Sequence, residues 1–554
     1  MKNHLFYPRV IIVTLLLMLT VLIVSQLNAQ PIWSFKTYDL APDGEYSIPD
    51  HMIEHNGRLV FRAAYDDMPA LYQFQNDDGT FTTFGVSETS DRLYEFVSVI
   101  DQIFYSVDNY LVDETTVWVS SGTLSSTTPI QTFSLDGNSS PIRNLHSVDG
   151  ILYFTVEDAN HGNEVWRTDG TLSGTYLIAD INEGSDSSIE YSSTSINWNG
   201  VLYFSADDGE HGYELVKVDP QTGNYELVKD INTGEESSSP DRFYIFNNHL
   251  YFVANDGAHG VELWRTDGTT EGTQLVHDIN EGPEGADPGL FASLDNALYF
   301  SAYTEETGYE LWGTDGTSEG TTLVKDIYPG TENGFYHYDP SVSDFMIAFD
   351  NALYFAGSND DLEVWRSDGT LEGTELFANI NVDRGSRPRY FTEHLGVVYF
   401  SATHADYGRR LWAIFPASPA PTLVDAVDIN SSSTPSHLTS VGADLFFDVF
   451  NGDAGFDLGH LEVVSSPQEA TIQLQSDIQQ LSDDGDLTQR QANRLRGNLQ
   501  NVLNRLDRGQ DNRAIDSLNR FITLVERYET FGYLSANQAD DLVNDAEGII
   551  ELID

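Results

Sequence analysis

Short apolar runs alternate with polar turns along most of this 554-residue chain. Between residues 242 and 279, four such runs follow one another: RFYIFNN, HLYFVAND, VELWRTD and TQLVHDI. Each run is rich in Val, Leu, Tyr, Phe or Trp, and turn-forming Asn, Gly or Pro residues flank it. The stretch therefore predicts a four-stranded antiparallel meander.

The same unit recurs along the chain at a spacing of about 48 residues, each copy marked by the triplet LYF or a relative of it. The copies of the triplet begin at Leu59, Ile103, Leu152, Leu202, Leu250, Leu298, Leu353, Val398 and Leu445. One small sheet cannot bury both of its faces, whereas sheets packed around an axis can. Four strands per repeat of about 40–50 residues are typical of a β-propeller. Nine units favour nine blades, and eight blades with one irregular unit stay an open alternative.

The two ends of the repeat array complement each other. The last unit stops after its third strand, while KTYDLAPDG at residues 36–44 aligns with a fourth strand, LVHDINEG. In this alignment Asp39 matches Asp278 and Leu40 matches Ile279. We therefore expect a mainly β fold, a single large propeller over residues 30–466 in which the N-terminal strand completes the last blade.

After Pro467 the apolar spacing becomes helical. Thr488 with Gln491, and Ser535 with Gln538, have the spacing of capping boxes, and Asp511 is expected to cap a further helix. Residues 468–554 are therefore predicted to form a small C-terminal α-helical bundle of four helices.

The first 29 residues have the pattern of a signal peptide. Lys2 and Arg9 precede an apolar run at residues 10–24, and Ala29 stands before the expected cleavage point. The run is short for a membrane span. We expect an exported protein, extracellular or at the cell surface, with the periplasm as an alternative and no membrane insertion.

The net charge and the cysteine content of the chain exclude several classes of partner and chemistry. With 87 acidic and 27 basic residues the net charge is −60, which argues against nucleic acid or an anionic membrane as partner. The chain has no cysteine, so no disulfide or thiol chemistry is expected. No cofactor is expected, and calcium is the one open exception.

The strongest motif, ELWRTDGT followed by GT and a fourth strand, starts at Glu164, Glu262, Glu310 and Glu363, with a degenerate copy at Glu214. It resembles the ELWxxDGT or hyalin-like repeat of exported bacterial proteins. The resemblance implies a propeller and no definite substrate.

Residues that recur at the same position in several blades are more consistent with a structural role than with catalysis or ligand binding. The Asp of TDGT is expected to accept backbone hydrogen bonds in a tight turn. The repeated Trp is expected to pack between blades. His161, His211 and His259 stand at equivalent hairpin positions in separate blades, so a shared zinc site is disfavoured.

Calcium is a hypothesis for the same hairpins. Asp207, Asp208, Asn255 and Asp256 offer the oxygen ligands that calcium prefers. The twelve-residue calcium-loop pattern is absent, so the alternative is a purely structural turn.

Departures from the repeat point to the best candidate for ligand binding. The segment VDRGSRPRYF carries Arg384, Arg387 and Arg389, and the next hairpin carries Arg409 and Arg410. Arginine forks bind carboxylate or sulfate in a bidentate manner, so an acidic sugar could dock here. Neutralisation of nearby carboxylates is the alternative.

The helical tail contains LNRFITLVERYETFGYLSANQADDLVNDAEGII at residues 518–550, where Phe521 and Ile522 match the first letters of the FIMAH motif. The tail resembles the FIMAH domain of secreted bacterial proteins, which implies an accessory role such as attachment or targeting.

The sequence singles out no catalytic residue. We therefore expect a secreted, non-enzymatic binding protein that recognises an extracellular polysaccharide or protein. The alternative is a secreted propeller glycan hydrolase or lyase with an axial carboxylate site. The oligomeric state is not predicted.

Overall fold

The protein is described by a computed structural model whose chain divides into two compact units, Thr37–His460 and Met1–Lys36 with Leu461–Asp554. The described residues are 32–38, 40, 49–65, 68–74, 81–85, 91–109, 111–134, 142–190, 194–335, 345–424, 434–450, 456–464, 467–483, 487–506 and 508–553. The predicted signal peptide and Asp39 lie outside these ranges.

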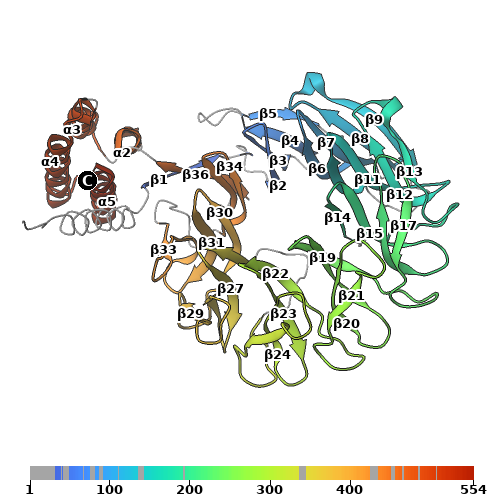
Figure 1. Ribbon diagram of the computed structural model, residues 1–554. Helices are drawn as coiled ribbons and strands as arrows, with labels where there is room; N and C mark the ends of the chain where they lie inside the picture. Colours follow the sequence, from blue (N-terminus) through green and yellow to red (C-terminus); the bar gives the residue numbers. More distant parts are fainter. Residues whose placement is uncertain are drawn as a thin grey trace, which may run out of the picture. The chain divides into compact units, whose positions relative to one another are not determined.

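The described strands form nine four-stranded antiparallel sheets, the blades of a β-propeller (Figure 1). Nine blades are thus confirmed, and the eight-blade alternative is wrong. Blades 1 to 3 contain β2 (Asp50–His55), β3 (Arg58–Tyr65), β4 (Met68–Phe74) and β5 (Phe81–Phe84); β6 (Asp91–Val99), β7 (Gln102–Asn109), β8 (Glu114–Ser120) and β9 (Thr128–Ser134); β10 (Arg143–Val148), β11 (Ile151–Asp158), β12 (Gly162–Thr168) and β13 (Tyr176–Ala179). Blades 4 to 6 contain β14 (Ser195–Trp198), β15 (Val201–Asp207), β16 (Tyr213–Val218) and β17 (Tyr225–Lys229); β18 (Asp241–Phe246), β19 (His249–Asn255), β20 (Val261–Thr266) and β21 (Gln274–His277); β22 (Gly289–Leu294), β23 (Ala297–Thr304), β24 (Gly308–Thr314) and β25 (Thr322–Lys325). Blades 7 to 9 contain β26 (Met346–Phe349), β27 (Ala352–Ser358), β28 (Leu362–Ser367) and β29 (Glu375–Ala378); β30 (Arg389–His394), β31 (Val397–His404), β32 (Gly408–Ile414) and β33 (Thr422–Leu423); β34 (Ser436–Val441), β35 (Asp444–Phe450), β36 (Phe456–Val464) and β1 (Ile32–Tyr38).

The ring closes as predicted, because β1 is the outermost strand of the last blade, next to β36. The Tyr38 ring lies 5.2 Å from that of Phe74 in blade 1, and Leu40 packs into the cluster between blades 9 and 1. The two ends of the propeller are therefore tied by one sheet.

The hydrophobic core lies between blades. The apolar residue that opens each LYF-type triplet stands on the second strand of its blade and is fully buried in all nine copies. Trp264 of blade 5 packs with Tyr203 and Leu215 of blade 4, and Trp412 of blade 8 packs with Tyr354 of blade 7. The predicted packing of the repeated Trp between blades is confirmed.

The Glu of the ELW motif fixes the connection to the next blade. The Glu214 carboxylate is fully buried and accepts backbone N–H bonds from Ile231, Asn232 and Ser238, all in the segment that leads to blade 5. Glu164, Glu310 and Glu363 accept equivalent bonds. Sequence reasoning gave this Glu no role.

The TDGT segment forms the turn before the outermost strand. Asp267 accepts hydrogen bonds from the N–H and the hydroxyl of Thr269, and Gly268 has a φ of +88°. The same bonds recur at Asp169, Asp315 and Asp368. The predicted structural role of this Asp is confirmed.

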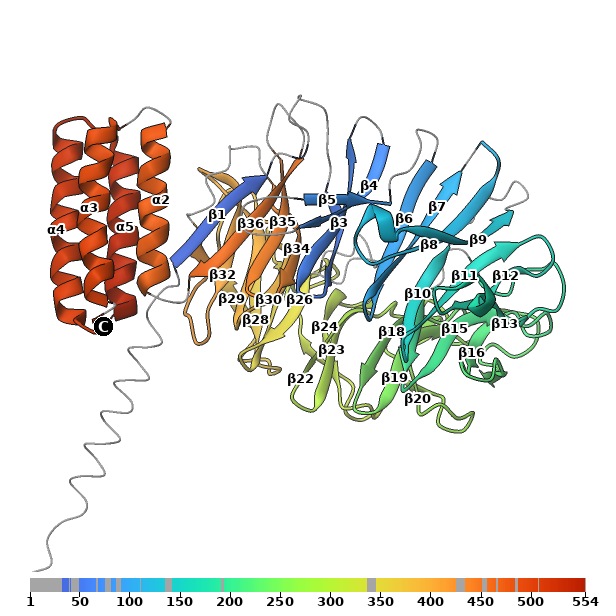
Figure 2. The ribbon, with the colours of Figure 1, turned by 90° about the horizontal axis from the view of Figure 1, so that it is seen from above.

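The helical unit is a bundle of α2 (Pro467–Asp483), α3 (Gln489–Leu506), α4 (Asp511–Thr530) and α5 (Ala536–Ile553), which run side by side (Figure 2). Their buried apolar residues form one core. Both predicted capping boxes are present, at Thr488 with Gln491 and at Ser535 with Gln538. The predicted cap at Asp511 is wrong, since Gln510 is the N-cap and Asp511 the first helical residue. No helix among the described residues is long and apolar enough to cross a membrane.

Candidate ligand site at the propeller axis

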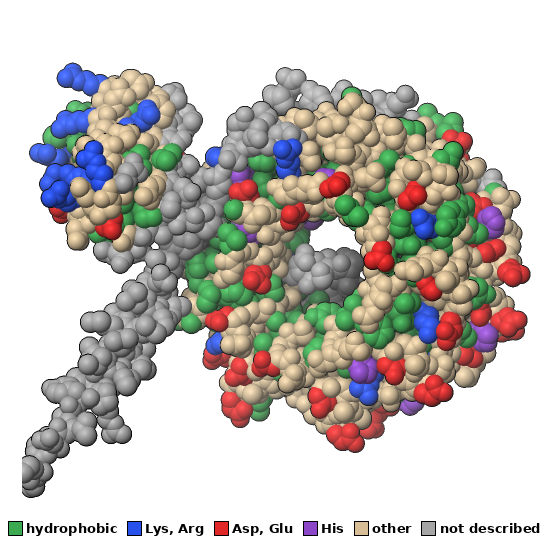
Figure 3. All heavy atoms as spheres, turned by 45° about the horizontal axis from the view of Figure 1, so that its top comes forward, with side chains coloured by type: hydrophobic (Ala, Val, Ile, Leu, Met, Phe, Trp, Pro, Cys, Tyr) green, Lys and Arg blue, Asp and Glu red, His purple; other side chains and the backbone are tan. Residues whose placement is uncertain are grey.

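The first strands of the nine blades surround the axis, because each contacts the first strand of both neighbouring blades. Figure 3 shows the opening that they surround. In six of them a bulge near the start of the strand holds a non-glycine residue with φ between 47° and 61°. These residues are His51, Asn144, Arg242, Leu290, Tyr390 and His437. Backbone strain of this kind is frequent at functional sites. The residue type at this position differs between blades, whereas the buried positions repeat.

Three of the predicted arginines meet at one of these bulges. The Arg409 guanidinium donates to the backbone carbonyl of Arg387 at 3.1 Å and to that of Ser401 at 3.3 Å. Burial, followed by the charges of Arg389 and Arg387, lowers the pKa of Arg409 to about 10. Arg387, Arg389 and Arg409 form no salt bridge within the part of the chain that the structure describes. We call these three residues the arginine cluster.

The other two predicted arginines lie outside this cluster. Arg384 is exposed in the loop before β30, and among the described residues it forms no hydrogen bond with the other four arginines. Arg410 follows Arg409 on β32, so its side chain leaves the opposite face of the sheet. It pairs with Ala402, the register that Glu214 has with Ala206, and therefore replaces the buried Glu of other blades.

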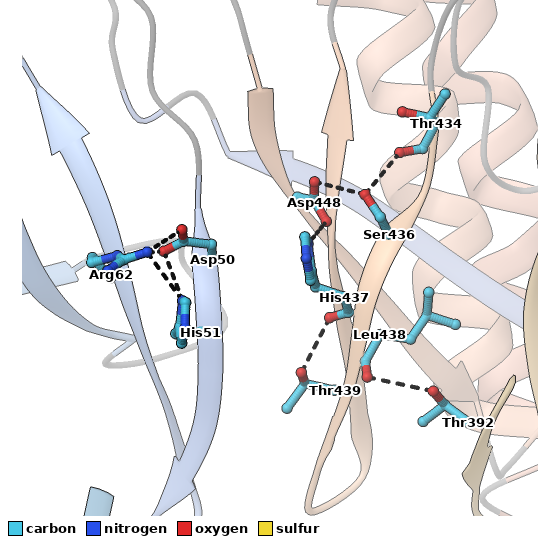
Figure 4. Close-up of polar contacts among 10 residues, drawn as sticks. All are labelled: Asp50, His51, Arg62, Thr392, Thr434, Ser436, His437, Leu438, Thr439 and Asp448. Atoms are coloured by element: carbon cyan, nitrogen blue, oxygen red, sulfur yellow. Dashed lines mark hydrogen bonds and ion pairs between the residues drawn. The ribbon is translucent and has the colours of Figure 1, made fainter. Parts of the chain in front are cut away.

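Two aromatic and ionisable side chains next to the cluster were missed from the sequence. Tyr390 follows Arg389 at the bulge, and its ring lies 5.6 Å from that of His437 in blade 9. The His437 Nδ1 lies 3.0 Å from Asp448, a buried carboxylate that also accepts a bond from Ser436 (Figure 4). Only their position in the repeat could have indicated them. Both residues stand at the start of the first strand of a blade, where the residue type differs from one repeat to the next.

Blade 1 holds a related group, also drawn in Figure 4. Asp50 accepts two hydrogen bonds from Arg62, and His51 lies 3.1 Å from the same guanidinium. Burial raises the pKa of Asp50, but the hydrogen bonds from His51 and Arg62 outweigh it, so the pKa lies below its ordinary value. Asp50 is thus held ionised in a pair with arginine.

Other carboxylates near the axis pair with arginine across blades. Arg143 of blade 3 lies 3.5 Å from Glu95 of blade 2. Arg242 of blade 5 lies 2.8 Å from Asp287, which precedes blade 6. These ion pairs link neighbouring blades.

The four candidate calcium ligands lie in two hairpin turns of different blades. Asp207 and Asn255 accept backbone N–H bonds from Gly209 and Gly257. Asp208 accepts the N–H groups of Glu210 and His211, and Asp256 does the same for Ala258 and His259. Among the described residues, no group of three or more His, Asp or Glu side chains is arranged to hold a metal ion.

The hairpin histidines each pair with an Asp of their own turn. The Nδ1 atoms of His161, His211 and His259 lie 2.8–2.9 Å from an Asp carboxylate three residues earlier. The hydrogen bond and charge of Asp208 raise the pKa of His211. The three histidines therefore serve their own turns, as predicted.

Comparison with known proteins gives a limited result. No curated protein matches the chain. Similar solved structures include a prolyl endopeptidase (10% identity, TM-score 0.40, 74% of this chain and 55% of that one) and oligopeptidase B from Leishmania major (11%, 0.38, 74% and 54%). The β-propeller domain of the Trilobed protease from Pyrococcus furiosus is similar at 12% identity (TM-score 0.30, 60% of this chain and 98% of that one). This chain spans about half the length of the two peptidases. Residues 471–551 match the FIMAH domain, so the C-terminal bundle carries the domain that its sequence indicated.

Proposed function

We propose that this protein is an exported binding protein whose propeller recognises an extracellular acidic polysaccharide at the arginine cluster. The observation that carries the proposal is that Arg387, Arg389 and Arg409 lie together without a carboxylate partner among the described residues. Export rests on the sequence of residues 1–29, and the repeat motif supports kinship with the ELWxxDGT proteins.

The contacts of the cluster argue against internal neutralisation. Arg409 donates to backbone carbonyls and to the Ser401 hydroxyl, and its charged neighbours are arginines. Clustered like charges repel, so a bound carboxylate or sulfate would relieve the repulsion and accept charge-assisted hydrogen bonds.

The large negative charge of the chain does not oppose binding at this point. At physiological salt a charge is screened over about 8 Å, so the local groups dominate the field that a docked sugar experiences. Tyr390, beside Arg389, offers a ring against which a sugar could pack.

A glycan-array screen of the mature chain tests the proposal, with the double variant Arg387→Ala/Arg389→Ala beside it. Arg58→Ala is the matched control, because Arg58 is exposed at the turn between β2 and β3, away from the start of the first strands. We expect the wild type and the control to retain uronate-containing or sulfated glycans, and the double variant to retain less of them. Retention of neutral glycans only would refute the proposal.

Catalysis on the same ligand is the second candidate, favoured by the contact between His437 and the buried Asp448. A carboxylate fixes the orientation of an imidazole that acts as a base. Incubating the array-selected glycan with the protein, and measuring reducing ends and unsaturated products, distinguishes an enzyme from a binding protein. His437→Ala would abolish a catalytic signal and leave the arginine contacts in place.

A further inference from the structure

The basic residues of the helical unit are confined to α3, α4 and the turn between them. All eight basic residues after Pro467 are arginines between residues 490 and 527, whereas α2 and α5 contain none. Figure 3 shows arginine side chains gathered on the helical unit, whereas the charged side chains on the propeller face that it draws are mostly acidic. In a chain with a net charge of −60, the α3–α4 hairpin therefore has the opposite local charge.

The arginines of α4 form a row. Arg513, Arg520 and Arg527 are exposed and recur every seven residues, so they share one side of the helix at intervals of about 10.5 Å. The core side of α4 is occupied by buried Leu518, Phe521 and Val525.

Two further exposed arginines stand on α3, the helix that packs against α4. Arg490 and Arg494 are exposed one helical turn apart. Burial raises the pKa of Tyr528 on α4, and the charge of Arg494 opposes that shift, so Arg494 lies near Tyr528. We call Arg490, Arg494, Arg513, Arg520 and Arg527 the arginine face.

Two other arginines of the helical unit make hydrogen bonds within it. Arg496 donates to Gln479 and Arg505 to the carbonyl of Arg513, so these two arginines serve the bundle itself. The five residues of the face form no salt bridge within the described chain, although Asp516 stands between Arg513 and Arg520 on the same row.

We propose that the arginine face is a docking surface for a linear polysaccharide with carboxylate, sulfate or phosphate groups. Rows of guanidinium groups match charges repeated along a linear polymer, and each fork can hold one such group by two hydrogen bonds. The acidic propeller of a second copy is the competing occupant, and self-association is therefore one of the outcomes of the test. The inference does not depend on the axial arginine cluster.

The test uses the full mature chain in the Arg387→Ala/Arg389→Ala background, so that axial binding cannot mask the result. Binding to immobilised polygalacturonate and dextran sulfate is compared with binding to neutral dextran at low salt. We expect Arg513→Gln/Arg520→Gln/Arg527→Gln to weaken binding about tenfold or more. The triple Lys variant at the same positions should keep most of it.

Three outcomes would overturn the proposal. The first is equal binding of the triple Gln variant and its parent, with an unchanged helical circular dichroism signal. The second is binding to vesicles of equal parts phosphatidylglycerol and phosphatidylcholine without binding to either polymer, which would assign the face to lipid. The third is self-association in sedimentation that the triple Gln variant abolishes, without polymer binding. Arg494→Gln on α3 repeats the test should the triple variant fail to fold.

Discussion

Glu214 and Ser238 join two consecutive blades. The buried Glu214 carboxylate, on the third strand of blade 4, accepts both the N–H and the hydroxyl of Ser238, at 3.0 and 2.5 Å. The Ser238 carbonyl in turn accepts the N–H of Asn255 at the end of the second strand of blade 5. The carboxylate thus holds a segment that pairs with the next blade.

Removing this carboxylate should destabilise the propeller. In Glu214→Ala, the N–H groups of Ile231, Asn232 and Ser238 lose their buried acceptor. We expect a loss of about 3 kcal/mol in the free energy of unfolding, measured by urea denaturation. Glu271→Ala, at an exposed Glu in a turn, is the control and should change stability by less than about 0.5 kcal/mol. Equal stability of the two variants would contradict the role given to Glu214.

Stability should fall as the pH rises through neutrality. Burial raises the pKa of Glu310 to about 8 and that of Glu164 and Glu262 to about 7, against opposing backbone hydrogen bonds. The ordinary value is 4.5, so between these limits the folded protein binds more protons than the unfolded chain. This stabilisation is complete below pH 4.5 and is lost as the pH passes about 8.

Thermal melting between pH 5 and 8.5 measures the effect. The slope of melting temperature against pH should be negative, smaller in Glu310→Gln and unchanged in the exposed Glu319→Gln. A melting temperature that rises over this range would show that the buried carboxyl groups are ionised throughout.

Gly268 should not tolerate a side chain. Its φ is +88°, and a Cβ would lie 2.9 Å from the Tyr203 hydroxyl of the preceding blade. Gly268→Ala should cost about 1–3 kcal/mol in the free energy of unfolding. Gly497→Ala is the matched control, because a Cβ there meets nothing within 4 Å and Ala favours the α3 helix. Calorimetry should show a lower propeller transition in the first variant and an unchanged or higher helical transition in the second.

Calcium should have little effect on the hairpin turns. Asp208 and Asp256 already accept two backbone N–H bonds each and pair with histidine. We expect the same melting temperature in calcium and in chelator. A rise of several degrees in calcium, absent from Asp208→Asn/Asp256→Asn, would support the calcium hypothesis.

The sequence predicted the scaffold well because the scaffold repeats. The buried LYF-type triplets, the turn at Asp267 and the closure by β1 each follow from patterns of local apolarity and turn chemistry. The role of Glu214 could not be predicted from the sequence. Its hydrogen-bond partners lie 17 to 24 residues away, and they come near it only because of the path that the segment between blades 4 and 5 takes in the fold.

The axial residues were harder to predict. Arg387, Arg389 and Arg409 stood out because they break the acidic pattern, and the structure brings these three together. Arg384 and Arg410 were grouped with them by sequence proximity. Proximity along the chain ignores the alternation of faces along β32, which separates Arg410 from Arg409. His437 and Tyr390 were missed because their contact joins bulges in two blades.

The central claim is that the arginine cluster binds an acidic polysaccharide. Its most direct test is isothermal titration of the mature wild type, Arg387→Ala/Arg389→Ala and Arg58→Ala with an acidic oligosaccharide selected on the array, all at one salt concentration. Two lost charge-assisted contacts should weaken the affinity of the double variant by about tenfold or more, while Arg58→Ala binds like the wild type. Equal affinity of all three proteins would contradict the claim.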